Sequence, residues 1–264
     1  MSELSSYRRP DRRVALITGS GSGAGAAIAH AYAAEGVRVV VSDIDFTLAG
    51  SVAAQIRDRG GQALAHRCDV ASEDQVATLI GRAVREFGGL HYVVNNAGPC
   101  LDDDPLDHWQ RIVNTNLMGT LLVTRHAIEA LKDRGGSIVN VAADAGLGFG
   151  AADQPAYGAA KAGILRFTAA MGSLQASHGI RVNCIVPDWI ATEYRLAWLE
   201  RLPAAERQAR GIPATVTTPQ QFAAGVLALS QREALAGRVA LCRSGQALQL
   251  VPYGDPGYQQ LEDF

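Results

Sequence analysis

The stretch VALITGSGSGAG, residues 14–25, decides the fold, because an apolar run passes directly into alternating glycines and then into a helical sequence. A glycine-rich turn between a strand and a helix allows backbone N–H groups to approach a pyrophosphate at the positive end of the helix. At the first strand–helix turn of a chain, this pattern is typical of dinucleotide binding. The cofactor-binding residues expected in it are Gly19, Ser20, Gly21, Gly23, Ala24 and Gly25.

Strand-like and helical segments alternate along the rest of the chain. The short, mostly apolar runs with the length of strands are Val14–Thr18, Val37–Ser42, Ala63–Cys68, Tyr92–Asn95, Ser137–Val141, Val182–Val186 and Arg238–Leu241. The helical stretches between them are Ala24–Glu35, Leu48–Arg59, Glu73–Phe87, Asp107–Leu131 and Tyr157–Ser177. Continuous apolar strands indicate a sheet that is covered on both faces. The pattern predicts an α/β protein: a single-domain Rossmann fold with a doubly wound parallel sheet of about seven strands and helices on both faces.

No repeat and no linker rich in proline and serine divides the chain, so residues 1–264 are expected to form one NAD(P)-binding domain. The basic residues 1–12 are expected to be a flexible N-terminal arm. Residues 193–213 are amphipathic, are bounded by prolines and follow a strand end, where open α/β sheets bind ligands, so we expect a substrate lid there. Residues 245–264 are expected to be a C-terminal tail.

Two helix starts carry the sequence of a capping box. Ser72 is followed three residues later by Gln75, and Thr218 by Gln221, with a proline at the first helical position of the second helix. In a capping box the two side chains satisfy backbone N–H groups at the helix start. We therefore predict helices that begin just after Ser72 and Thr218.

Composition and charge exclude several functions. A net charge of −2 gives no footprint for nucleic acid, which would need lysine and arginine clustered on one face of the fold. No run approaches the roughly 18 apolar residues that a membrane helix needs, and the first dozen residues lack the apolar core of a secretory signal. The four cysteines are scattered and show no CxxC spacing, so we expect a cytoplasmic protein without a metal site.

An acidic residue follows the second strand, about twenty residues after the glycines. Asp43 stands where a carboxylate accepts hydrogen bonds from the adenosine ribose and repels a 2′-phosphate, and Ile44 follows it. Two alternatives remain open. Asp45 could bind the ribose instead, or Asp43 could be only a solvated acid at the start of a helix. The sequence favours NAD as the cofactor, with NADP less favoured.

Further motifs follow in order along the chain. They are Thr18–Gly25 with the spacing TGxxxGxG, Asp69-Val70, Asn95-Asn96-Ala97-Gly98, Tyr157 and Lys161 in the spacing YxxxK, and Pro187-Asp188-Trp189-Ile190-Ala191-Thr192. With these motifs the chain resembles the short-chain dehydrogenase/reductase family over nearly its whole length. The resemblance implies that the cofactor is also bound by Asp69, Val70, Asn96, Ala97, Gly98, Tyr157, Lys161, Pro187, Ile190 and Thr192.

The resemblance also implies a catalytic group made of Asn116, Tyr157 and Lys161. Tyr157 and Lys161 are four residues apart on a helix, so both project from one face. A free tyrosine has a pKa of ~10, and a neighbouring ammonium group favours its phenolate. Tyr157 is then expected to exchange a proton with the substrate oxygen while a hydride moves between NAD(H) and the substrate carbon, and Asn116 to support the proton path.

Three positions depart from the family pattern. The catalytic serine that the family carries after the fifth strand falls on Ala143, and Asp144 is the nearest polar residue. Pro187-Asp188 replaces the Pro-Gly turn that the family usually has, and Arg243-Ser244-Gly245 replaces its usual Asp-Gly-Gly. A protonated Asp144 could replace the serine, or the substrate could need Tyr157 alone. Alternatively, the protein is a catalytically weak or inactive NAD-binding member, acting as a sensor or a structural subunit.

The substrate is expected to be a small carbonyl compound or secondary alcohol. The lid residues Trp189, Tyr194, Leu196, Trp198 and Leu199 favour an apolar or ring-shaped molecule. The resemblance implies a homodimer or a homotetramer.

Overall fold

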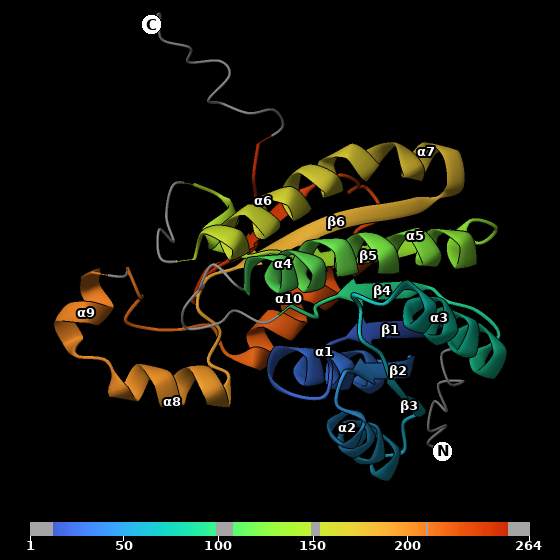
Figure 1. Cartoon of the computed structure of the whole chain (residues 1–264). Coiled ribbons are helices and arrows are strands. Elements are labelled where there is room, and N and C mark those ends of the chain that lie inside the picture. Colours follow the sequence, from blue (N-terminus) through green and yellow to red (C-terminus); the bar gives the residue numbers. More distant parts are fainter. Residues whose placement is uncertain (1–12, 99–107, 149–153, 210, 253–264) are drawn as a thin grey trace, which may run out of the picture.

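The computed structural model describes residues 13–98, 108–148, 154–209 and 211–252 (Figure 1). A single sheet runs through these residues in the strand order β3-β2-β1-β4-β5-β6-β7-β8. The parallel strands are β1 (Val14–Thr18), β2 (Arg38–Asp43), β3 (Ala63–Arg67), β4 (Tyr92–Asn95), β5 (Gly136–Val141), β6 (Ile180–Pro187) and β7 (Val239–Cys242). This order confirms the predicted α/β fold with a doubly wound parallel sheet.

The last strand was not predicted. β8 (Gln249–Leu250) pairs antiparallel with β7, and Arg238 donates a hydrogen bond of 3.0 Å to the Val251 carbonyl oxygen. Part of the segment expected to be a tail is therefore the edge of the sheet. Two paired residues leave too short a pattern for sequence analysis to detect. The N-terminal arm, residues 1–12, and the rest of the expected tail, residues 253–264, lie outside the described residues.

Helices cover both faces of the sheet. The helices on one face are α1 (Gly23–Ala34), α2 (Phe46–Asp58) and α10 (Pro219–Gln231), and those on the other are α3 (Glu73–Phe87), α5 (Gly119–Leu131) and α6 (Pro155–Ala170) (Figure 1). Successive side chains of a strand point to opposite faces. Ala15 and Ile17 accordingly join the core under α1, whereas Val14 and Leu16 join the core under α3 and α5. This double burial explains the continuous apolar strands.

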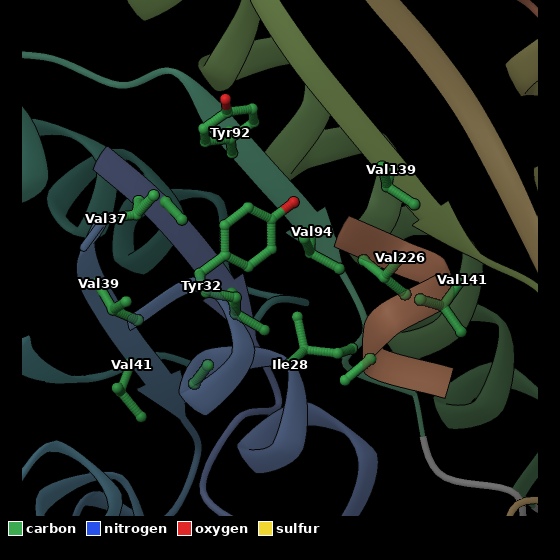
Figure 2. Packing of buried hydrophobic residues seen from close by; sticks show 14 of the residues in the cluster. Ile28, Tyr32, Val37, Val39, Val41, Tyr92, Val94, Val139, Val141 and Val226 are labelled. Carbon is green, nitrogen blue, oxygen red and sulfur yellow. The ribbon is translucent and has the colours of Figure 1, made fainter. Parts of the chain in front are cut away.

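The strands contribute mostly β-branched residues to the core beneath α1. Figure 2 shows Ile28 and Tyr32 of α1 among valines of the sheet, with Val226 of α10 beside them. Tyr32 is fully buried, and burial raises the pKa of its hydroxyl well above the ordinary value. Its ring contacts the Tyr92 ring at 5.2 Å between centroids. Aromatic and branched side chains thus fix α1, and with it the glycine turn, on the sheet.

The long helix expected before β5 is interrupted. It consists of α4 (Trp109–Val113), a π-helical segment (Asn114–Met118) and α5. The segment Asn114–Met118 contains no glycine or proline that would mark the break, and Gly119 follows just after it. Single π turns inside α-helices occur often at functional sites. Here the π turn carries Asn116.

The remaining helices are short and lie toward the end of the chain. They are α7 (Leu174–His178), α8 (Glu193–Arg201) and α9 (Ala204–Ala209). Within the described ranges, none of the helices combines the length and the hydropathy that crossing a membrane requires.

One of the two predicted capping boxes is present. Thr218 Oγ1 accepts a hydrogen bond of 3.1 Å from Gln221 N, and Gln221 Oε1 accepts one of 2.9 Å from Thr218 N. The prediction of a capping box at Ser72 was wrong, although α3 does begin directly after this residue. Gln75 Oε1 accepts a hydrogen bond of 2.9 Å from Asp69 N instead, and the Ser72 side chain makes no capping bond. The Gln75 side chain therefore holds the turn at Asp69.

We predict that Thr218→Ala lowers the free energy of unfolding by about 1 kcal/mol, because the start of α10 loses its capping oxygen. Ser72→Ala is the matched control, since its side chain makes no capping bond, and it should cost clearly less. Urea denaturation of the two variants and the parent measures both values. If both variants lost the same free energy of unfolding, the conclusion that Thr218 caps its helix and Ser72 does not would be contradicted.

Candidate functional site

A large cleft lies at the carboxyl ends of the parallel strands. The chain leaves β1 toward one side of the sheet and β4 toward the other, and this reversal opens a crevice in doubly wound sheets. The cavity there has a volume of about 2110 Å³. The sequence-predicted residues that line it are Gly19, Gly23, Ala24, Gly25, Asp43, Ile44, Asp69, Val70, Asn96, Ala97, Gly98, Ala143, Asp144, Tyr157, Lys161, Pro187, Ile190 and Thr192. The structure thus brings nearly all of them to one place.

Three predicted residues do not line this cavity. The Ser20 side chain is buried, and its hydroxyl donates to the Ile17 carbonyl oxygen at 2.8 Å and accepts from Ser42 N at 3.0 Å. Gly21 N donates to Asp43 Oδ2 at 2.9 Å. Asn116 is buried behind the cleft. Ser20 and Gly21 therefore shape the turn, and Ser22, which was not predicted, lines the cavity in their place.

The glycine turn leaves little room for side chains, as Gly25 and Gly23 illustrate. A Cβ atom on Gly25 would overlap the Gly19 carbonyl oxygen. Gly23 has a φ of +53°, and a Cβ atom there would lie 3.1 Å from Thr192 Cγ2. The turn is thus packed between α1, the loop after β4 and the start of α8. This close packing at the first turn of α1 fits a dinucleotide pyrophosphate, which requires the backbone to approach closely.

Asp43 and Asp45 have separate tasks. Asp45 caps α2, because its carboxylate accepts from Thr47 N at 2.8 Å and from Leu48 N at 3.3 Å. Asp43 lines the cleft, and its two oxygens accept from Gly21 N at 2.9 Å and from Asp45 N at 3.1 Å. Backbone donors hold the Asp43 carboxylate at the end of β2, where the sequence predicted an acid facing the ribose.

The loops after β1 and β4 are joined by side chains. Asn96 Nδ2 donates to the carbonyl oxygens of Thr18 at 3.1 Å and Gly19 at 2.9 Å. In return, Thr18 Oγ1 accepts from the backbone N–H groups of Asn96 and Ala97, each at 3.1 Å. The NNAG motif therefore fixes the glycine turn from the neighbouring strand.

The helix α6 presents Tyr157 and Lys161 to the same cavity. Lys161 is buried, its ammonium group donates to the Val141 carbonyl oxygen at 3.1 Å, and it lies 5.3 Å from the centroid of the Tyr157 ring. A Cβ atom on Gly98 would overlap Asn116 Oδ1 and would lie 3.3 Å from Lys161 Nζ. Gly98 is thus the small residue that allows Asn116 and Lys161 to lie close together.

The end of β5 places Ala143 and Asp144 beside this group. The Ala143 methyl group is buried and lines the cleft. Asp144 begins a short 3₁₀ turn (Asp144–Gly146), and its carboxylate accepts from Ala145 N at 2.8 Å. Partial burial raises the pKa of Asp144, and the nearby Asp188 carboxylate adds to the rise, whereas Arg243 opposes it. A carboxyl group with a raised pKa therefore stands next to the alanine.

Asp188, one of the departures from the family pattern, has a clear structural role. Its carboxylate accepts from Thr217 Oγ1 at 2.6 Å and from Ser244 N at 3.0 Å. Ile190 and Thr217 also form a parallel bridge. Thr217 follows the predicted lid, so these contacts join the parts of the chain that precede and follow residues 193–213. Sequence analysis marked Asp188 as unusual but did not detect this connection.

The lid carries a stacked group that sequence analysis recognised only in part. α8 and α9 belong to residues 193–213, the segment predicted to be a lid, and lie beyond the carboxyl ends of the strands (Figure 1). The rings of Trp189 and Trp198 stack at 5.7 Å between centroids with an angle of 10°. The Arg195 guanidinium carbon lies 5.3 Å and 5.1 Å from these two centroids. All three residues line the cleft, but only the tryptophans were predicted to matter.

Comparison with known proteins gives the same family as the motifs. The family model of the short chain dehydrogenases matches residues 13–203, so the chain belongs to this family. It is 38% identical to a 3-oxoacyl-[acyl-carrier-protein] reductase of Synechocystis over 69% of this chain and 75% of that protein. It is 37% identical to a cis-4-hydroxycyclohexanecarboxylate dehydrogenase of Sinomonas cyclohexanicum over 68% of this chain and 74% of that protein.

Solved structures agree. An actinorhodin polyketide ketoreductase with NADPH superposes with a TM-score of 0.81 and 28% identity, over 90% of this chain and 98% of that chain. A short-chain type dehydrogenase/reductase from Mycobacterium marinum gives a TM-score of 0.79 and 32% identity, over 88% of this chain and 94% of that chain. The protein is an oxidoreductase of this family, whose members bind nicotinamide cofactors.

Proposed function

We propose that this protein transfers a hydride between NAD(H) and a small carbonyl compound or secondary alcohol, with Tyr157 as the acid and base. The observation that carries the proposal is the shared cavity. The glycine turn, Asp43, and the pair Tyr157 and Lys161 all open onto one cleft. A dinucleotide site and a proton-transfer group are thereby accessible to the same bound molecules. The family resemblance leads us to expect a homodimer or a homotetramer.

The residues that would hold the cofactor follow the strand ends. Gly19, Gly23, Ala24 and Gly25 would face its phosphates and Asp43 its adenosine ribose. Asp69, Val70 and the loop Asn96–Gly98 would border the adenine and the centre of the cofactor. Pro187, Ile190 and Thr192 would hold the nicotinamide end. When bound, the nicotinamide ring supplies or accepts the hydride.

Tyr157 would exchange the accompanying proton with the substrate oxygen. The Lys161 ammonium lies over the Tyr157 ring and is itself held by the Val141 carbonyl oxygen. A positive charge beside the phenol stabilises the phenolate. Asn116, buried behind Gly98, would support the path by which the proton is replaced.

One observation favours a second function. Ala143 offers no hydroxyl at the position where the family has its catalytic serine, and losing one donor to a reacting oxygen costs on the order of 10²–10³ in rate. A weak or inactive NAD-binding member, acting as a sensor or a structural subunit, would have the same cofactor contacts. Turnover measurements separate the two functions.

We predict that NADH binds roughly tenfold or more tightly than NADPH, about 1.4 kcal/mol, because the Asp43 carboxylate meets a 2′-phosphate with like charge. The ketoreductase relative was solved with NADPH, so the argument for NADH comes from Asp43 and not from the comparison. Asp43→Ala should narrow the ratio, measured by calorimetry. Asp45→Ala is the control, since Asp45 caps α2 and does not line the cleft. Equal affinities in the parent would refute the role of Asp43.

We predict that Tyr157→Phe lowers kcat by roughly 10² or more, the usual contribution of a positioned acid or base. Its affinity for NADH should stay unchanged in fluorescence titration. The assay is NADH oxidation with cyclic ketones, or NAD reduction with cyclic alcohols. If the parent binds NADH but turns over none of them, the second function is favoured. If the variant is as fast as the parent, Tyr157 is not the acid.

We predict that Ala143→Ser raises kcat/KM on simple ketones roughly tenfold, about 1.4 kcal/mol of barrier, because the new hydroxyl donates to the reacting oxygen. Asp144→Ala in the parent is the matched test of a substitute donor. A gain in the first variant with no loss in the second indicates a missing donor. No gain with a large loss makes Asp144 the donor. No change in either contradicts a role for the end of β5.

A further inference from the structure

One cation of the lid, Arg195, is held in a fixed place. Arg195 is half-buried, and its guanidinium group lies against the stacked rings of Trp189 and Trp198. Its backbone N–H donates to Thr192 Oγ1 at 3.3 Å in the first turn of α8. An arginine that packs on aromatic faces keeps a defined orientation, so less conformational entropy is lost when it binds a ligand. Arg195 is therefore a preorganised cation in the wall of the cleft.

The way Arg195 is held suits an oxyanion. Stacking uses the faces of the guanidinium group, whereas its N–H groups point outward in its plane. That planar set of donors matches a carboxylate, which has two oxygens in one plane. The two indole rings add an apolar surface next to the charge. The combination fits a molecule with an apolar body and a carboxylate at one end.

Other charges of the cleft leave Arg195 as the group for such a ligand. Among the described residues that line it, the cations are Lys161, Arg111 and Arg195. Lys161 is buried at the reacting end, Arg111 belongs to α4, and Arg243, which lines the smaller cavity beside the cleft, follows β7. None of these three cations lies on the lid. Glu193 and Glu206 of the lid also line the cleft and would repel an anion that approached either of them. Among the described lid residues that line the cleft, Arg195 is thus the cation that would attract a carboxylate.

The stacked group lies on the substrate side of the cleft. Trp189 also lines a smaller cavity of about 250 Å³, together with Asp144 and Asp188. Asp144 follows Ala143 at the reacting end. We propose that Arg195 binds a carboxylate of the substrate remote from the reacting carbon, so that the substrates are hydroxy acids or oxo acids with an apolar body. This inference rests on the proposed hydride transfer.

The first experiment compares an acid with its neutral ester. The probes are cis-4-hydroxycyclohexanecarboxylate and its methyl ester, each assayed with NAD. Arg195→Met should lower kcat/KM for the acid roughly tenfold or more, mainly through KM, because a charge-assisted hydrogen bond is lost. The ester should change less than about threefold. Arg195→Lys should restore only part of the loss, since an ammonium group lacks the planar set of donors.

The control variant is Arg201→Met on the same helix. Arg201 is exposed, donates to the Ala197 carbonyl oxygen at 3.0 Å and does not line the cleft. It should leave the ratio of acid to ester unchanged. Equal losses for acid and ester in Arg195→Met would show that Arg195 only packs the lid. A loss of NADH affinity with an unchanged ratio would assign Arg195 to the phosphates of the cofactor. Either outcome overturns the proposal.

A binding measurement keeps the inference separate from turnover. Cyclohexanecarboxylate, which has no hydroxyl group to oxidise, is titrated into the complex with NADH by calorimetry. It should bind to the parent and roughly tenfold more weakly to Arg195→Met. If the parent turns over neither probe yet binds this acid through Arg195, the proposed function fails and the carboxylate site stands. If the parent does not bind the acid, the carboxylate site is refuted, whatever the turnover.

Discussion

The hydrogen bonds between Asn96 and Thr18 are the constraint on which the cleft depends. They join the loops of two adjacent strands whose chains then turn to opposite faces of the sheet. Carbonyl oxygens of the glycine turn are paired by the Asn96 amide, which keeps their partial negative charge from a bound phosphate. Gly25 can then pack directly on the Gly19 carbonyl group, and α1 starts where an anion can be bound. This connection adds to the pairing of β1 with β4 and to the packing of Gly19 on Ala97, and it fixes the turn against the loop after β4.

The three departures from the family pattern form one connected group. Asp188, in place of a glycine, binds the backbone of Ser244, in the segment that replaces the usual Asp-Gly-Gly. The same carboxylate contributes to the raised pKa of Asp144, which follows the alanine that replaces the serine. Residues that share hydrogen bonds and charges do not act additively when they are substituted. Each of the three departures is therefore best understood together with the other two.

Sequence analysis predicted those features that depend on local chemistry. Glycines between a strand and a helix, buried strands and the cap at Thr218 each have a signal within a few residues, and the structure contains all of them. It failed where two partners compete or where the partner is distant. The Gln75 side chain could accept a hydrogen bond from the backbone N–H of Ser72 or from that of Asp69, and in the structure it accepts the one from Asp69. The strand β8 depends entirely on β7, since two residues carry no periodicity of their own.

The site shows the same division. The motif residues could be placed on strand ends and on one helix face, which is sufficient to bring Asp43 and Tyr157 to one cleft. The π turn around Asn116 and the packing of Arg195 could not be predicted. The residues of the π turn carry no composition that distinguishes them from an α-helix. The packing of Arg195 requires Trp189, which precedes α8, to stack on Trp198 within α8. Tertiary contacts, rather than propensities, decide both features.

The closed base of the predicted lid, residues 193–213, makes this segment an exchangeable part of the molecule. The bridge between Ile190 and Thr217, and the bond from Thr217 to Asp188, fix both ends of the excursion at one point of the sheet. When the ends of a loop are already held together, doubling its length costs only about 0.6 kcal/mol of closure entropy. Evolution can therefore lengthen, shorten or replace the segment without disturbing the sheet. Selectivity and fold can diversify independently in a scaffold of this kind.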